Sequence, residues 1–149
     1  MLVALLGLSA CTGESPAPAS SAPPADTGAT TAPPTAAAPV TLVSDGSAAD
    51  NLPYFSRIVA DVWAGPDNVA GRSYIDALTA AGFDKSAMQV TQDESTIGNP
   101  AESIEFSVRW GDQCLVGQVG PSIGSPVSTV LPGLAGGGCL IGNTRAIDW

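Results

Sequence analysis

The chain contains no histidine among its 149 residues, and this restricts the chemistry open to it. Imidazole is the commonest general base and the commonest metal ligand in proteins. Without it, Ser-His-Asp and Cys-His catalysis are both excluded. Lys85 is the only lysine, and its immediate neighbour Ser86 is poorly placed for a Ser–Lys proton relay. The common nucleophilic mechanisms are therefore not expected here.

Carboxylates are the remaining side chains with catalytic potential. Four of them flank a loop that contains Gly98-Asn99-Pro100, namely Asp93, Glu94, Glu102 and Glu105. Two carboxylates held about 5–10 Å apart across a cleft can hydrolyse a glycosidic bond. The same oxygens could bind calcium loosely, although the spacing matches no EF-hand loop. A solvated acidic loop is the simplest interpretation, so the sequence predicts a non-catalytic domain without a cofactor or a metal.

The beginning of the chain has the pattern of an export signal. An apolar run over residues 2–8 is followed by Ser9, Ala10 and Cys11, as is typical of a secretory signal. The ending at Cys11 resembles the lipobox of bacterial lipoproteins, whose cysteine receives a diacylglyceryl group and becomes the new N-terminus. The resemblance implies a lipoprotein signal segment over residues 1–11, with Cys11 lipidated. Because no Lys or Arg precedes Cys11, we expect the true start to lie upstream.

The next segment, residues 12–39, has the composition of a tether. Pro, Ala, Ser and Thr occupy 24 of its 28 positions, and Val, Ile, Leu and aromatic residues are absent. Such a segment cannot bury enough apolar surface to offset the entropy of ordering. The sequence predicts a disordered, proline-stiffened tether with a reach of roughly 30 Å as a coil, and an O-glycosylated stalk is the alternative.

Two cysteines remain if Cys11 is lipidated, and they are Cys114 and Cys139. Because an exported chain meets an oxidising environment, we expect these two to form a structural disulfide. A redox-active pair is the alternative, but it lacks the close Cys-x-x-Cys spacing. The disulfide would attach the C-terminal part of the chain to the middle of the domain.

Residues 40–149 form one domain that begins with two helices. The first is predicted from apolar residues at helical spacing, with Asp50 or Asn51 as its cap and Pro53 in its first turn. The second is predicted over 69–81, with Asp67 or Asn68 as its cap and an end at Gly82. The apolar residues of the first helix are Leu52, Phe55, Ile58, Val59, Val62 and Trp63.

Strands follow the helices. Residues 103–110 alternate, so that Ile104, Phe106, Val108 and Trp110 share one face. A two-residue turn at Gly111-Asp112 predicts a hairpin that pairs Trp110 with Gln113 and places Gly117 opposite Phe106. Further short strands are expected near Met88–Gln92, over 127–131 and over 139–141. Two helices followed by a small, mostly antiparallel sheet indicate an α+β fold.

The last residues end the chain on a large aromatic side chain. Trp149 either docks on the domain or belongs to an exposed contact surface with Arg145 and Asp148. Chain ends usually fray unless they pack against the domain. Pairing of Arg145 with Asp148 would hold this tail in place.

Several segments of the domain form a distinctive set. They are Tyr74 to Leu78, Ala81 to Asp84, Ser103 to Trp110, the Cys-Leu-Val-Gly-Gln and Cys-Leu-Ile-Gly runs, and the Thr-Arg-x-Ile-Asp-Trp ending. Together they resemble a domain of unknown function found in small actinobacterial lipoproteins. The resemblance covers roughly residues 52–149 and implies a shared fold and a location in the cell envelope, but no catalytic residues.

Composition and charge complete the functional expectation. A net charge of −9 and only five Lys and Arg residues argue against nucleic acid and against anionic lipid as partners. We expect a lipid-anchored interaction or scaffold module on the outer face of the cell membrane, with an envelope protein or a neutral or cationic ligand as its partner. The alternatives are a carboxylate-based hydrolase of a wall polymer and a small-ligand carrier accessory to a transporter.

Overall fold

A computed structural model describes residues 39–149 of the chain. Among these residues, no helix is both long enough and apolar enough to cross a membrane. The predicted signal segment, the predicted lipidation at Cys11 and nearly all of the predicted tether lie outside the described residues. The elements are α1 (Ala48–Trp63), α2 (Gly71–Ala80), the 3-10 helix η1 (Lys85–Ala87), β1 (Met88–Thr91), β2 (Ile104–Trp110), β3 (Gln113–Val119), β4 (Val127–Pro132) and β5 (Thr144–Arg145).

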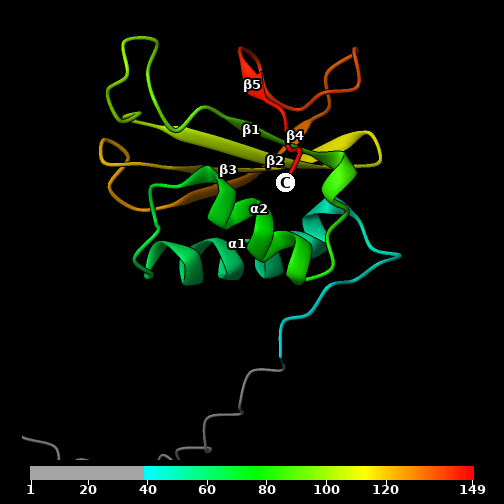
Figure 1. Cartoon of the computed structure of the whole chain (residues 1–149). Coiled ribbons are helices and arrows are strands. Elements are labelled where there is room, and N and C mark those ends of the chain that lie inside the picture. Colours follow the sequence, from blue (N-terminus) through cyan, green and yellow to red (C-terminus); the bar gives the residue numbers. More distant parts are fainter. Residues whose placement is uncertain (1–38) are drawn as a thin grey trace, which may run out of the picture. The chain divides into compact units, whose positions relative to one another are not determined.

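The strands form one five-stranded sheet in the order β4-β3-β2-β1-β5, and every neighbouring pair is antiparallel. Both helices cover the same face of this sheet (Figure 1). Helix α1 packs against β3 and β4, whereas α2 packs against β1 and β2. The α+β prediction is therefore confirmed, with the sheet antiparallel throughout.

Helix α1 begins earlier than the sequence predicts. Its N-cap is Ser47, whose hydroxyl accepts a hydrogen bond from the Asp50 N–H, while the Asp50 carboxylate accepts one from the Ser47 N–H. The Ser47 hydroxyl and the Ser47 N–H both donate to the Asp50 carboxylate, and these two bonds lower the pKa of Asp50. The predicted caps were wrong because Asp50 lies at the third helical position of a capping box, and the buried Asn51 binds Val43 instead. Pro53 lies beyond the first turn, inside the helix.

Helix α2 begins at Gly71, and its N-cap Ala70 supplies no side-chain hydrogen bond. The prediction of Asp67 or Asn68 as the cap was therefore wrong. Asn68 instead donates from its side chain to the carbonyl of Trp63. The predicted end at Gly82 agrees with the structure, where this residue follows the helix with a φ of 98°. Only glycine adopts such an angle without strain.

The hairpin of β2 and β3 has the predicted register. Trp110 pairs with Gln113, and Phe106 pairs with Gly117. The ring of Phe106 lies over Gly117 and stacks on Tyr74 of α2, with 4.4 Å between the ring centroids. Because both rings are fully buried, this stack joins the sheet to the helical layer.

Alkaline pH is expected to destabilise the fold through Tyr74. Burial raises its pKa to about 12, whereas an unfolded tyrosine titrates near 10. Since the folded pKa is the higher one, stability is complete below about pH 10 and falls between about pH 10 and 12, by about 2–3 kcal/mol. Urea unfolding across this range measures the loss, and it should be much smaller in Tyr74→Phe. An equal loss in both proteins would contradict the assignment.

One predicted strand is absent from the described residues. Residues 139–141, expected to be extended and paired, form a loop, and the fifth strand is the two-residue β5 beside β1. Cys139 and Leu140 are nevertheless buried. Apolar residues alone do not distinguish a short strand from a loop that is packed down.

Candidate functional site

The main apolar core consists of residues from both helices and from the sheet. The face of the sheet opposite the helices, here called the helix-free face, carries a smaller apolar cluster of its own. Its members are Cys114, Val116, Cys139 and Leu140. Cys114 and Val116 belong to β3, whereas Cys139 and Leu140 come from residues 133–143, which we call the disulfide loop. The predicted bond between Cys114 and Cys139 is confirmed, with 5.8 Å between their Cα atoms.

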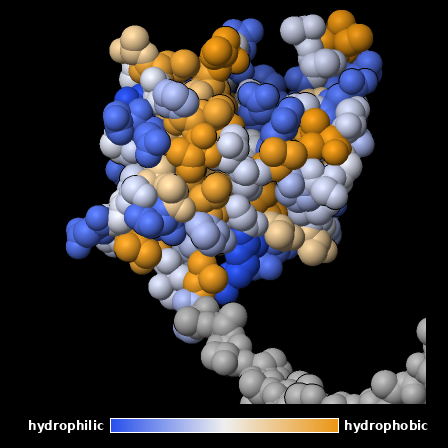
Figure 2. Space-filling view, turned by 180° about the vertical axis from the view of Figure 1, so that it is seen from behind, coloured by the Kyte–Doolittle hydropathy of each residue, from blue (hydrophilic) through white to orange (hydrophobic). Residues whose placement is uncertain are grey.

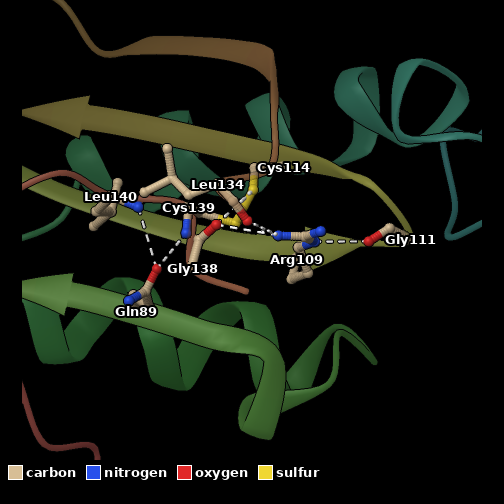
Figure 3. Close-up of a disulfide and its surroundings, with 8 residues drawn as sticks. All are labelled: Gln89, Arg109, Gly111, Cys114, Leu134, Gly138, Cys139 and Leu140. Carbon is tan, nitrogen blue, oxygen red and sulfur yellow. Dashed lines mark hydrogen bonds between the residues drawn. A yellow bond between two sulfur atoms is a disulfide. The ribbon is translucent and has the colours of Figure 1, made fainter. Parts of the chain in front are cut away.

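Polar side chains from two strands fasten the disulfide loop to the sheet (Figure 3). From β1, the Gln89 side-chain oxygen accepts hydrogen bonds from the N–H groups of Cys139 and Leu140. From β2, the Arg109 guanidinium donates to the carbonyl oxygen of Gly138 at 3.1 Å and to that of Gly111 at 2.7 Å. The loop is therefore held by a covalent bond and by hydrogen bonds from both sides.

Between the disulfide loop and strand β4 lies an apolar groove of about 380 Å³. Three of its lining residues are large, exposed hydrophobic side chains: Val127 at 48%, Leu131 at 43% and Ile141 at 85%. Figure 2, the view from behind, shows apolar residues gathered in a band on the molecular surface. The groove is lined by Glu105, Val116, Gln118, Val127, Thr129, Leu131, Cys139, Leu140 and Ile141.

The groove was not predicted from the sequence, although a signal for it was present. Residues 127, 129 and 131 of β4 all line it, which is the period of two expected when one face of a strand is apolar. The sequence of β4 also contains no charged residue. What the sequence could not indicate is that the disulfide loop would form the opposite wall.

The four candidate carboxylates separate into different environments. Asp93 has a structural role, because one of its oxygens accepts from the Gly71 N–H at 2.8 Å and the other binds Arg145 at 2.8 Å. Glu102 is exposed. Glu94 and Glu105 line a common hollow of about 400 Å³ beside the groove, so two of the four share one site.

Asp93 thus provides the cap that α2 lacks in its own sequence. A carboxylate at a helix N-terminus satisfies a free N–H and complements the helix dipole. Asp93→Ala should lower the free energy of unfolding by about 1–2 kcal/mol, since both the cap and a partly buried ion pair are lost. The neighbouring exposed Glu94→Ala is the control and should change stability by less than about 0.5 kcal/mol in urea titrations. Equal effects would contradict this role.

The C-terminal segment is attached to the domain through Trp149. Its indole N–H donates to the Asp76 carboxylate at 2.9 Å, and Lys85 donates to its backbone oxygen. The bond from Trp149 lowers the pKa of Asp76. Arg72, Lys85 and Arg145 lie over the indole ring at 5.2–5.3 Å from its centroid. The expected pairing of Arg145 with Asp148 was wrong, because Asp93 takes that guanidinium and Asp148 is exposed.

The part of the chain that the structure describes contains no cluster of residues suited to bind a metal ion. Nowhere in residues 39–149 do three or more Cys, Asp or Glu side chains gather as a metal-binding group. The groove on the helix-free face is an apolar hollow of a size that can accept a ligand or a side chain. Its lining is apolar apart from a few polar groups, as in many binding sites.

Comparison with known proteins identifies a family but no activity. Residues 59–143 match the model of a domain of unknown function, DUF6993. No curated protein and no solved structure matches the chain significantly. The matched segment contains α2, the hairpin, β4 and both cysteines of the disulfide. Since this segment is more than half of the chain, the protein belongs to the DUF6993 family.

Proposed function

We propose that this protein is a lipid-anchored, non-catalytic interaction module on the outer face of the cell membrane, and that the groove is its contact surface. The single observation that carries the proposal is the apolar groove with Val127, Leu131 and Ile141 exposed at its rim. Contiguous apolar surface on a soluble domain commonly marks an interaction site. The partner is expected to be neutral or cationic, because the chain has a net charge of −9.

The location is supported by the start of the chain and by the disulfide. Cys11 follows the apolar and small residues of a lipobox-like segment. The Cys114–Cys139 bond agrees with an oxidising compartment, where structural disulfides persist. A cysteine carrying two or more acyl chains would anchor the protein stably, whereas a single chain binds reversibly.

Two measurements test the anchor. The intact mass of the mature protein should show an acylated Cys11 as its first residue, and Cys11→Ser should shift the protein from the membrane fraction to the soluble fraction. Ser9→Thr alters the same segment but keeps the thiol, and it serves as the control. An unmodified Cys11 in a membrane-free protein would refute the anchor.

A photoreactive amino acid tests the groove in the intact cell. Placed at Ile141, which is 85% exposed, it should form a cross-linked adduct of discrete mass. Placed at Ile97, which is 80% exposed but outside the groove lining, it should form none. Equal cross-linking at both positions, or none at Ile141, would overturn the groove as the contact surface.

A hydrolase remains the second candidate, because Glu94 and Glu105 line one hollow. Purified full-length protein incubated with cell-wall glycan would then release reducing ends, and Glu105→Gln would abolish that release. The interaction module predicts no release by either protein. The small-ligand carrier required an apolar pocket between helices and sheet, whereas the groove lies on the opposite face.

A further inference from the structure

The groove is continuous with an unprotected sheet edge. Strand β4 is the outermost strand on its side, and its six residues pair only with β3. Among the described residues, no backbone hydrogen bond joins Val127–Pro132 to any segment other than β3. Alternate N–H and C=O groups of such a strand point outward, ready to pair with another strand. The opposite edge is much shorter, since β5 has two residues.

The usual protections of an edge strand are missing from β4. Charged side chains, an internal proline, a bulge or a covering segment normally prevent pairing with other chains. The sequence Val-Ser-Thr-Val-Leu-Pro carries no charge, and its one proline, Pro132, is the last residue. Val127 and Leu131 are 48% and 43% exposed. A strand that is neither charged nor covered indicates an edge that is used.

From these observations, and resting on the function proposed above, we propose that β4 binds an extended, neutral or basic peptide segment of a partner protein as a sixth strand. Side chains of the added strand that point to the helix-free face would lie beside Val127, Thr129 and Leu131, the β4 residues that line the groove. Backbone hydrogen bonds supply affinity in this mode, and the groove selects apolar side chains.

The negative charge of the groove and of the whole chain bears on which peptide segments would bind. Glu105 is the one charged residue in the groove lining, and its carboxylate has no ion-pair partner within residues 39–149. Together with the net charge of −9, this favours a neutral or basic segment over an acidic one. The same charge opposes pairing of β4 with β4 of a second copy, because each copy carries a net charge of −9.

A random-decapeptide phage library panned on the immobilised full-length protein tests the proposal. We expect enriched peptides with apolar side chains at alternating positions and a neutral or positive net charge. Val127→Lys places a charge on the edge and should weaken binding of a synthetic enriched peptide at least tenfold. Val69→Lys changes a residue of similar exposure, 45%, outside the groove lining and should leave binding unchanged. Unchanged melting temperatures would show that both variants fold.

The geometry of binding has its own test. Two versions of the enriched peptide are compared, one N-methylated at the odd-numbered residues and the other at the even-numbered residues. One version should lose binding and the other should keep it, because only one of these two sets of N–H groups pairs with β4. Absence of enrichment, insensitivity to Val127→Lys, or equal tolerance of both methylated peptides would overturn the sixth strand. A dimer dissociated by Val127→Lys would identify a second copy as the occupant instead. If Ile141 still cross-links specifically in any of these cases, the groove function stands and only the strand addition fails.

Discussion

Replacing Cys114 and Cys139 together by alanine is expected to lower the free energy of unfolding by about 3–4 kcal/mol. The bond closes a loop between residues 25 positions apart, and the chain-entropy model assigns a value of this size to such a loop. Both sulfurs are also buried, so their replacement leaves space in the small cluster on the helix-free face. Urea unfolding of the oxidised protein and of the double variant measures the difference.

Loss of the disulfide should also loosen the wall of the groove that the disulfide loop forms. Gln89 and Arg109 still bind the disulfide loop, but their hydrogen bonds are weak compared with a covalent bond. Amide hydrogen exchange at Cys139 and Leu140 in the oxidised protein should accelerate upon reduction with a thiol. Cys11→Ser, which leaves the bond intact, should change neither stability nor exchange. A loss below about 1 kcal/mol would mean that the hydrogen bonds alone hold the loop.

Gly117→Val is expected to destabilise the fold by more than about 3 kcal/mol. A Cβ atom at this position would lie 2.3 Å from the Phe106 ring, far inside contact distance. The ring cannot move aside easily, because it is fully buried and stacks on Tyr74. Overpacking of a dense core costs typically 1–3 kcal/mol and more when a rigid ring is displaced.

The control for this prediction is Gly136→Val. No atom lies within 4 Å of a Cβ built at Gly136, which is exposed in the disulfide loop. Thermal unfolding of the two variants should differ strongly, with Gly136→Val close to the parent protein. Similar melting temperatures for the two variants would show that the Phe106 ring repacks without cost.

The hairpin illustrates how far the sequence could be interpreted. Residues 104–110 alternate and are followed by a two-residue turn, and these two local features together determine one register. Shifting that register by one residue would expose Phe106 and bury Arg109. The disulfide could likewise be predicted, because only two cysteines remain if Cys11 is lipidated. The hairpin register thus follows from neighbouring residues, and the disulfide follows from the number of cysteines.

The groove could not be predicted in the same way. Its floor and rim come from β2, β3 and β4, and its opposite wall comes from the disulfide loop. The loop lies there because Gln89 and Arg109, 50 and 29 residues from their partners, bind its backbone. Such contacts have no periodic signal in the sequence, since any polar side chain of suitable length could make them.

The amino-acid sequence by itself determined the two helices, the hairpin register and the α+β class, because periodicity and turn residues act over a few positions, and a count of the cysteines indicated the disulfide. The tertiary structure decided that Asp93 caps α2, that Arg145 pairs with Asp93 and not with Asp148, and that residues 139–141 pack as a loop. It also left β4 at an open edge. These features arise where distant segments meet, and their energies depend on the packing of the whole domain.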